Sequence, residues 1–278
     1  GRPHAEAIAL DQAGDGAAGA TIFVTLEPCA HQSERGPVCA DLICSSGLGR
    51  VVIGCEDPDP RTAGRGIDRI RAAGISVDLL VSYEAQASLS GYLMQRRSAR
   101  PEVTLKIATS LDGCIALANG ESQWITGDAA RAHCHAMRAK SDAILVGGAT
   151  LRADAPRLDV RLPGLENRSP ARWVLSRSPP PEDWRALPSP QAISTMDEVQ
   201  YLFIEGGSQT AAAFLAADLV DRVLLYRAPI MIGGGVPAIA DFGLTSLTDA
   251  HGRWRMEERR QLGSDTLEVY TRLPCSQG

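Results

Sequence analysis

The sequence lacks any apolar run near the roughly 18 residues that a membrane-spanning helix needs. Its first residues, Gly1-Arg2-Pro3-His4, also lack the basic and apolar pattern of a signal peptide. Nor is there an excess of positive charge, because the 278 residues carry a formal net charge of −5. We therefore expect a cytoplasmic protein with no membrane partner and no nucleic-acid partner.

Cysteines are present, but in an odd number and without the spacing of a disulfide framework. The seven are Cys29, Cys39, Cys44, Cys55, Cys114, Cys134 and Cys275. With no export signal, this pattern indicates a reducing compartment, where some thiols are metal ligands and the others are small core residues.

Length and composition indicate a globular chain of about two domains. Hydrophobic residues make up 44% and charged residues 22%, which excludes a disordered or fibrous chain. In the first part, strands alternate with helices, which predicts a mostly parallel sheet covered by helices. The expected elements are helices over 4–11, 39–46 and 67–73, and strands over 21–26, 50–54 and 75–81.

A basic stretch that ends in proline, residues 88–101, predicts the linker, so we expect domains over residues 1–98 and 99–278. Residues 178–200 contain five prolines and little periodicity, which predicts a loop or a place where sequence is missing. The other elements expected in the second domain are strands over 102–107, 143–146, 172–176, 201–204 and 222–226, and helices over 128–140 and 209–217.

Three residues near the start of the chain have the types and order of a catalytic zinc site. His4 lies at a helix start, and Cys29 and Cys39 follow the first strand. One His and two Cys leave the fourth tetrahedral position open for water, whose pKa the metal lowers to about 7. Glu6 can face this water as the proton-transferring group, as in the H-x-E…P-C-x-x-C pattern of zinc deaminases.

Two other interpretations fit the same residues. Nine residues separate Cys29 from Cys39, where the deaminase pattern has two. A surface histidine with two buried thiols would need no metal. A structural zinc would need a fourth ligand. His31 has a suitable side chain, although the Cys and His of a Cys-x-His sequence rarely bind the same ion.

Two glycine turns in the second domain predict a phosphate-binding edge. Gly147-Gly148-Ala149-Thr150 follows one strand, and Glu205-Gly206-Gly207-Ser208 joins another strand to a helix. Glycines let backbone N–H groups approach a phosphate at a helix N-terminus, where the dipole favours anions. Such turns are more common than phosphate sites, so this signal is weak by itself.

The stretches HAEAIAL, VTLEPCAH, PVCADLI, GLGRVVIGCEDPDP and AGRGI resemble the deaminase half of the bifunctional riboflavin-biosynthesis deaminase/reductases. Resemblance to the reductase half of the same family is found in the stretches VTLKIATSLDG, GESQWITGDAARAHCHAMRA, AILVGGATLRADAPRLDVR and FIEGGSQTAAAFLAADLVDRVLLYRAPIMIGG. The resemblance implies an α/β protein, with a cytidine-deaminase-like three-layer domain followed by a dihydrofolate-reductase-like domain. In this family the deaminase domain begins several tens of residues before the first zinc ligand, so residues 1–98 are expected to hold an incomplete domain.

The resemblance also implies roles for particular residues. In the deaminase domain, His31 and Asp57 match substrate-binding positions, while Asp59 stands where the family has Asn; simple turn chemistry is the alternative for these Asp-Pro pairs. Asp154 is expected to be catalytic in the reductase domain. NADPH is expected to contact Ala108, Trp124, Thr150, Asp154, Arg177, Gly207, Ser208, Gln209, Thr210, Ala211, Ala212 and Ala213, and the substrate Ser122, Arg138, Leu158, Arg161 and Glu205.

Several of these residues also have simpler explanations. Without the resemblance, Trp124 would be interpreted as a residue packed in a hydrophobic core, and Asp154 as a residue that caps a turn. Arg138 and Arg161 would be solvated charges in an unrelated protein, but as reductase residues they suit a ribose 5-phosphate, which guanidinium binds in a bidentate way. Arg177 suits the 2′-phosphate of NADPH.

We expect two consecutive reactions on a phosphorylated pyrimidine substrate, in a homo-oligomer. Zinc-dependent deamination comes first, and NADPH then delivers hydride to the ribosyl group to give the ribityl product. One alternative is a reductase with a structural deaminase remnant. Another is a zinc-stabilised nucleotide-binding module, although such a module needs neither Glu6 nor Asp154. An enzyme that edits nucleic-acid bases would need a basic stripe and aromatic platforms, which the sequence lacks.

Overall fold

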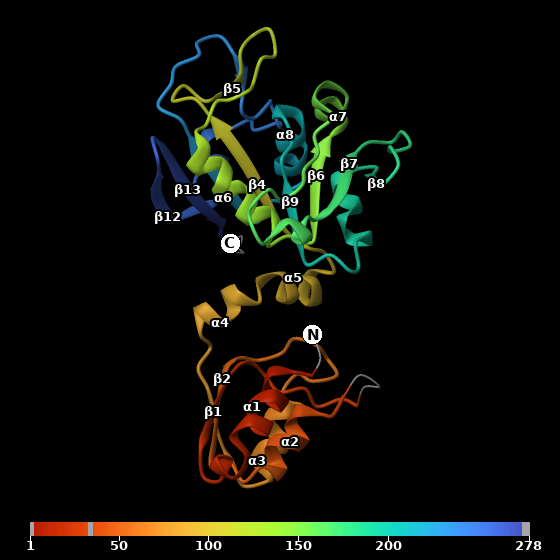
Figure 1. Cartoon of the computed structure of the whole chain (residues 1–278), viewed down its shortest axis with the longest axis vertical. Coiled ribbons are helices and arrows are strands. Elements are labelled where there is room, and N and C mark those ends of the chain that lie inside the picture. Colours follow the sequence, from red (N-terminus) through yellow and green to blue (C-terminus); the bar gives the residue numbers. More distant parts are fainter. Residues whose placement is uncertain (1–2, 33–35, 274–278) are drawn as a thin grey trace. The chain divides into compact units, whose positions relative to one another are not determined.

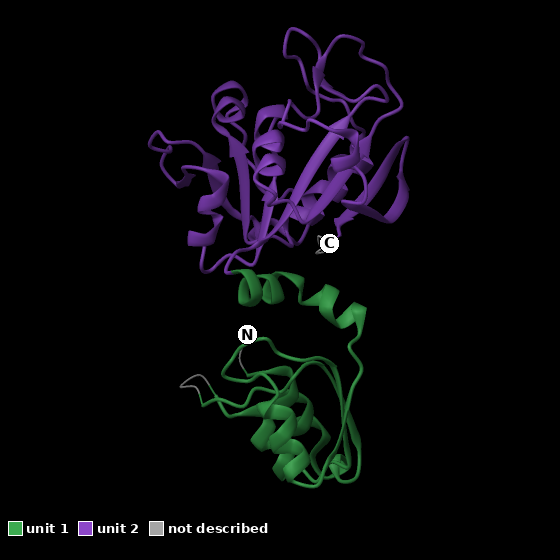
Figure 2. Cartoon of the chain, turned by 180° about the vertical axis from the view of Figure 1, so that it is seen from behind, with its two compact units in different colours: residues 1–98 green, residues 99–278 purple. Residues whose placement is uncertain are grey.

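The computed structural model describes residues 3–32 and 36–273 and divides the chain into two compact units, residues 1–98 and 99–278 (Figure 1, Figure 2). The division falls at the domain boundary expected from the sequence. Cys275 lies outside the described residues. Within the described ranges, no helix is both long and apolar enough to cross a membrane.

Unit 1 is built on three parallel strands in the order β1-β2-β3. The strands are β1 (Thr21–Leu26), β2 (Arg50–Cys55) and β3 (Ser76–Leu79). The helices are α1 (Ala5–Ala13), α2 (Cys39–Ser45), α3 (Arg65–Ala72), α4 (Tyr83–Ser88) and α5 (Ser90–Ser98), with a short 3₁₀ helix η1 (Gly14–Ala17) after α1.

Strand β2 is the centre of unit 1 because both of its faces are covered. Val51 and Ile53 share a core with Ile43 of α2 and with α3. Side chains alternate along a strand, so Gly54 faces the other way. A Cβ atom on Gly54 would lie 2.5 Å from the Cβ of Ala85 in α4. Helices therefore cover both faces of β2, as the expected three layers require, whereas the face of β1 that carries Phe23 is exposed.

Unit 2 contains an eight-stranded sheet in the order β12-β13-β10-β4-β9-β6-β7-β8. The six strands from β10 to β8 in this order are parallel, and β13 and β12 extend the sheet as an antiparallel hairpin. The strands are β4 (Glu102–Thr109), β6 (Ala143–Gly147), β7 (Ala171–Leu175), β8 (Trp184–Leu187), β9 (Tyr201–Ile204), β10 (Arg222–Arg227), β12 (Trp254–Leu262) and β13 (Asp265–Arg272). A separate pair consists of β5 (Cys114–Ala116) and β11 (Val236–Pro237).

Helices cover both faces of this larger sheet as well. The core on one face includes Phe214 of α8 (Ser208–Ala216) and Ile193 of η3 (Pro190–Thr195). The core on the other face includes Ala130 and Cys134 of α6 (Asp128–Arg138). Helix α7 (Gly148–Asp154) directly follows β6, and the 3₁₀ helices η2 (Glu166–Arg168) and η4 (Leu247–Ala250) lie in loops. The carboxyl ends of the parallel strands meet at one edge, where ligands bind in such sheets.

The linker predicted over residues 88–101 contains the boundary between the two units, but most of this stretch is helix α5 and not an irregular segment. Leu93 of this helix is buried, and the basic residues Arg96 and Arg97 occupy its last turn, where positive charge is favoured. The basic character that suggested a linker is therefore that of a helix end.

The loop predicted over residues 178–200 is wrong for residues 184–187 and 190–195, whereas the alternative of missing sequence stays a prediction. Strand β8 pairs with β7 in this stretch, and η3 follows it. The prolines lie outside β8, so they remove no hydrogen bond from its pairing with β7, and Leu187 and Met196 are buried in the core. The sequence did not predict the β12–β13 hairpin, because β12 is a charged edge strand with little apolar alternation.

Candidate active sites

The three expected metal ligands come together in unit 1. His4 immediately precedes α1, Cys29 lies in the loop after β1, and Cys39 is the first residue of α2. The His4 Nδ1 atom lies 3.2 Å from Cys39 Sγ and 3.7 Å from Cys29 Sγ, and all three atoms lie within 4.8 Å of one another. Bonds of about 2.0–2.3 Å to one Zn²⁺ can span these separations, so the trio fits a zinc ion.

Both thiols of this trio are buried, and each changes the ionisation of the other. The hydrogen bond with Cys39 lowers the pKa of Cys29 to about 5, which favours the thiolate that a metal binds. Hydrogen bonding to Cys29, burial and the charge of Glu6 raise the pKa of Cys39. The Glu6 carboxylate is therefore close enough to act on the cluster. The alternative interpretation, a surface histidine with two unconnected buried thiols, therefore does not fit this arrangement.

His31 does not complete the metal site. Its Nδ1 atom lies 3.2 Å from the hydroxyl of Thr62 instead. In the part of the chain that the structure describes, the cluster has three members, which corresponds to a site with one open position.

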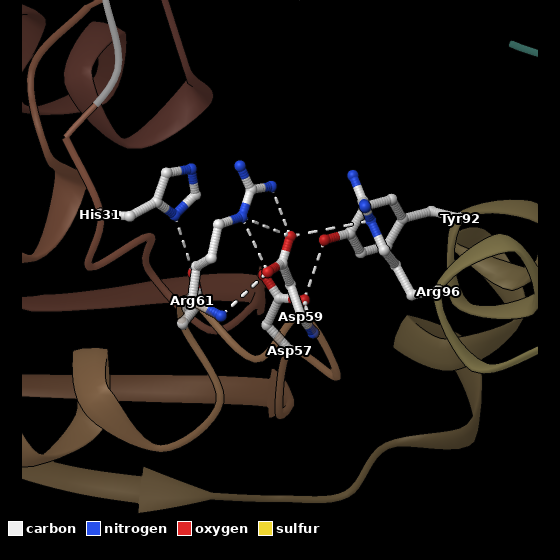
Figure 3. A network of polar contacts seen from close by, with 7 residues as sticks. His31, Asp57, Asp59, Arg61, Tyr92 and Arg96 are labelled. Atoms are coloured by element: carbon white, nitrogen blue, oxygen red, sulfur yellow. Dashed lines mark hydrogen bonds and ion pairs between the residues drawn. The ribbon is translucent and has the colours of Figure 1, made fainter. Parts of the chain in front are cut away.

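Asp57 begins a network of polar contacts beside His31 (Figure 3). Its Oδ1 atom accepts hydrogen bonds from the Tyr92 hydroxyl at 2.8 Å and from the backbone N–H of Asp59 at 2.9 Å. The second contact is turn chemistry, as the alternative interpretation stated. The first joins Asp57 to helix α5, so the carboxylate does more than close a turn.

Glu27 was not predicted, although it organises the same region. Its buried carboxylate accepts hydrogen bonds from the backbone N–H groups of Gly64, Gly66 and Ile67 at 2.9–3.1 Å. It thus caps the start of α3 while lying two residues before Cys29. A Cβ atom on Gly66 would lie 2.2 Å from the carbonyl oxygen of Pro28, so this close approach requires glycine. The sequence feature that could have indicated Glu27 is its position between the first strand and the expected zinc ligand Cys29.

In unit 2, the two glycine turns lie side by side at the carboxyl edge of the sheet. A Cβ atom on Gly147 would lie 2.3 Å from Thr210 Oγ1, and one on Gly206 would lie 2.5 Å from Thr210 Cβ. A Cβ atom on Gly207 would lie 3.6 Å from Thr150 Oγ1. The first turns of α7 and α8 are therefore adjacent.

Both helix starts keep hydrogen-bond donors for a ligand. Gly147 and Gly207 are the N-caps of α7 and α8, and neither helix has a side-chain cap. The Ser208 hydroxyl is buried and has no hydrogen-bond partner among the described residues. Backbone N–H groups and a hydroxyl at a helix start favour an anion such as a phosphate.

Arg138 and Glu205 form a buried ion pair between α6 and the end of β9. Arg138 Nε and Nη2 donate to the Glu205 carboxylate at 2.5 and 2.9 Å, and Nη1 donates to the carbonyl of Asp159 at 2.9 Å. Burial raises the pKa of Glu205, but hydrogen bonds from Arg138 and the charge of Lys106 outweigh it, and the pKa is lowered. Arg138 is therefore not a solvated charge, and two of its five N–H groups remain for a ligand.

The other residues expected in this unit differ in exposure. Trp124 is 64% exposed, and the Arg131 guanidinium lies 4.8 Å from its ring centre, so Trp124 is not a core residue. Leu158 is buried in the core beside α6 with a φ of 56°, and Arg161 is exposed. Ala108 is partly buried and pairs with Tyr226, and Ala211 and Ala212 are buried on α8, while Ser122, Gln209, Asp154 and Arg177 are exposed and Ala213 is partly buried.

These two units define a class of protein. A His–Cys–Cys trio with a neighbouring carboxylate is the ligand set of a zinc deaminase, and paired helix starts at the edge of a parallel sheet are typical of an α/β nucleotide-binding domain. Residues 1–55 match the cytidine and deoxycytidylate deaminase zinc-binding region, and residues 101–196 and 191–267 match the RibD C-terminal domain.

Relatives named as riboflavin biosynthesis protein RibD match almost the whole chain. The riboflavin biosynthesis protein RibD of Mycobacterium tuberculosis is 39% identical over 96% of this chain and 83% of that protein. RibD of Escherichia coli K12 is 35% identical over 95% and 85%. The structure of Acinetobacter baumannii RibD matches with a TM-score of 0.86 and 33% identity, over 98% of this chain and 86% of the other. The chain belongs to the RibD family of bifunctional deaminase/reductases of riboflavin biosynthesis.

A second solved relative covers this chain to the same extent. It is the Thermotoga maritima diaminohydroxyphosphoribosylaminopyrimidine deaminase/5-amino-6-(5-phosphoribosylamino)uracil reductase, with a TM-score of 0.86 and 30% identity over 98% of this chain and 86% of that chain.

Proposed function

We propose that this chain deaminates diaminohydroxyphosphoribosylaminopyrimidine in unit 1 and reduces the ribosyl group of the product to ribityl in unit 2, with NADPH. Among the features of the chain, the trio His4, Cys29 and Cys39 beside Glu6 carries the first assignment. The adjacent starts of α7 and α8, with the unpaired Ser208 hydroxyl, support the second.

In unit 1, His4, Cys29 and Cys39 hold Zn²⁺, which when bound supplies an acidified water as the nucleophile. The Glu6 carboxylate accepts the proton of that water and returns it to the departing amino group. His31 and Asp57 orient the pyrimidine, because each is held by a hydrogen bond from a second segment of unit 1.

In unit 2, the first turns of α7 and α8 bind the NADPH phosphates through backbone N–H groups and Ser208. Bound NADPH supplies the hydride. Arg177 binds its 2′-phosphate, and Ala108, Trp124, Thr150 and Asp154 position the nicotinamide. The substrate is bound by a set of residues around the buried ion pair, namely Ser122, Arg138, Leu158, Arg161 and Glu205.

The test follows both reactions on one sample of the full chain. Ammonia release and NADPH oxidation are measured separately, first with the deaminase substrate and then with its deaminated product. We expect ammonia release without NADPH, and NADPH oxidation on the deaminated product. Oxidation of NADPH with no ammonia release would instead support a reductase with a structural deaminase remnant.

A further inference from the structure

Two arginines of unit 1 share one buried carboxylate, although neither was singled out in the sequence. Arg61 Nε and Nη2 donate to Asp59 at 2.6–3.2 Å, and Arg96 Nε lies 3.8 Å from Asp59 Oδ2. Arg96 also lies over the ring of Tyr92, 5.4 Å from its centre. Figure 3 shows the two guanidinium groups on either side of Asp59.

The carboxylate is buried while the guanidinium groups are exposed. The Asp59 side chain is 4% exposed, against 58% for Arg61 and 44% for Arg96. Hydrogen bonds from Arg61 hold the pKa of Asp59 well below its usual range, so Asp59 stays ionised. A ligand that approaches from solvent therefore meets positive charge first, with the negative charge beneath it.

Asp59 itself is already fully engaged. Its Oδ1 atom accepts from the backbone N–H and Nε of Arg61, and its Oδ2 accepts from Nη2 and faces Arg96. Arg61 in contrast has five N–H groups. Its Nη1 has no partner among the described residues, so it can donate to a ligand. Asp59 thus positions the arginines and does not bind a ligand directly.

The cluster lies at the edge of the sheet that carries the zinc trio. Strands β1 and β2 are parallel neighbours with Leu26 opposite Cys55, so the loops that carry Cys29 and Asp57 leave the sheet together. The contact between His31 and Thr62 ties the loop after Cys29 to the residue next to Arg61. In Figure 3 the His31 ring and the Arg61 guanidinium point to the same side.

We propose that Arg61 and Arg96 form the subsite that binds the phosphate group of the deaminase substrate, and that Asp59 positions them. Guanidinium groups suit phosphate because they donate paired hydrogen bonds and keep their charge. This subsite rests on the proposed deamination and adds the residues that recognise the phosphorylated end of its substrate.

The experiment measures ammonia release by the full chain with Arg61→Gln, Arg96→Gln and the double substitution. We expect KM to rise about 10- to 100-fold, as for a lost hydrogen bond to a charged group, with kcat within about threefold. The same substrate without its phosphate should show no such rise. Arg71→Gln is the matched control, because Arg71 is an exposed arginine of unit 1 outside this cluster. Zinc content and NADPH oxidation on the deaminated product report that the variants fold.

A KM equal to that of Arg71→Gln, or an equal rise with the dephosphorylated substrate, would overturn the subsite. Binding of ribose 5-phosphate, counted by calorimetry, separates this proposal from the deamination itself. The double variant should bind one molecule fewer than the wild type. If the wild type releases no ammonia, the proposed deamination is wrong. In that case the subsite is still supported if the double variant binds one molecule of ribose 5-phosphate fewer, and it is refuted if the double variant binds as many as the wild type.

Discussion

At the scale of single residues, unit 1 concentrates its chemistry in the first turn of α1. His4 immediately precedes this helix and Glu6 is its second residue, so one turn carries both the proposed metal ligand and the proposed base. The charge of Glu6 already acts on Cys39. A fixed separation of ligand and base is what proton transfer to and from a zinc-bound water requires.

Glu6→Gln should therefore stop the deaminase and spare the metal. The amide keeps the size of the side chain but cannot accept the proton, so ammonia release should fall about 10²- to 10⁴-fold. Zinc content, measured by elemental analysis, should stay at the wild-type level. NADPH oxidation on the deaminated product should also be unchanged, and its loss would contradict the assignment of Glu6 to unit 1 alone.

Asp154 offers the corresponding test in unit 2. It is the last residue of α7, it is exposed, and no hydrogen bond to its carboxylate is found in the described part of the chain. If it faces the nicotinamide and substrate, Asp154→Asn should lower NADPH oxidation by about 10-fold or more while ammonia release continues. The rate is measured per folded molecule, because a residue that only caps a turn would lower stability and leave that rate intact.

At the scale of elements, α6 connects the core of unit 2 to the expected substrate site. Its buried face holds Cys134 in the core, while Arg138 at its end reaches Glu205 after β9. His133 lies on the same helix between Tyr226 of β10 and Arg260 of β12. Because Arg260 must donate to Nε2, His133 Nδ1 carries the proton and donates to the Tyr226 oxygen.

Removing one partner of the buried ion pair should be costly. Arg138→Met leaves the Glu205 charge buried and unpaired, so we expect a loss of about 3–5 kcal/mol in the free energy of unfolding. All four tryptophans lie in unit 2, so their fluorescence in urea follows this unit alone. The double variant Arg138→Met/Glu205→Leu should lose much less than the sum of the two single changes. Additive losses would show that the two charges are not coupled.

The stability of unit 2 should also depend on pH through α6. Burial and the charge of Arg260 lower the pKa of His133, and burial with Arg138 lowers that of His135. The folded state therefore resists protonation, and stability present above about pH 6.5, the unfolded value, is lost as pH falls. Replacing His133 with Gln should remove about 1 kcal/mol or less of this loss between pH 7.5 and 5.5. An unchanged pH slope in urea unfolding would refute the role of His133, with His135→Gln as the comparison.

The elements also show what local sequence can predict. Strands β1 and β9 have the bounds expected, because each is a short β-branched or aromatic run between polar residues. The convergence of His4, Cys29 and Cys39 was also predicted, since the types and order of these residues indicate a metal site. Glu27, Arg61 and Tyr92 were not, because their roles depend on contacts such as Tyr92 with Asp57, 35 residues apart in the sequence. Local patterns contain no information on which distant segments meet.

At the scale of the whole molecule, each unit has its own sheet and its own hydrophobic core. The residues assigned to deamination all lie in residues 1–98, and those assigned to reduction all lie in residues 99–278. Neither set borrows a residue from the other unit. The two reactions should therefore respond independently to changes that act on one set.

Removal of zinc tests this independence most directly. In the described ranges, the His–Cys–Cys trio of unit 1 is the one cluster that fits a metal ion. A chelator should therefore lower ammonia release by more than about 100-fold, because the water nucleophile loses its activation. NADPH oxidation on the deaminated product should continue at the wild-type rate, and tryptophan-monitored unfolding of unit 2 should not shift. Added Zn²⁺ should restore ammonia release, whereas added Mg²⁺ should not, because thiolates are poor ligands for a hard cation. Loss of both reactions on chelation would show that unit 2 depends on the metal site, and ammonia release that survives chelation would refute the zinc assignment.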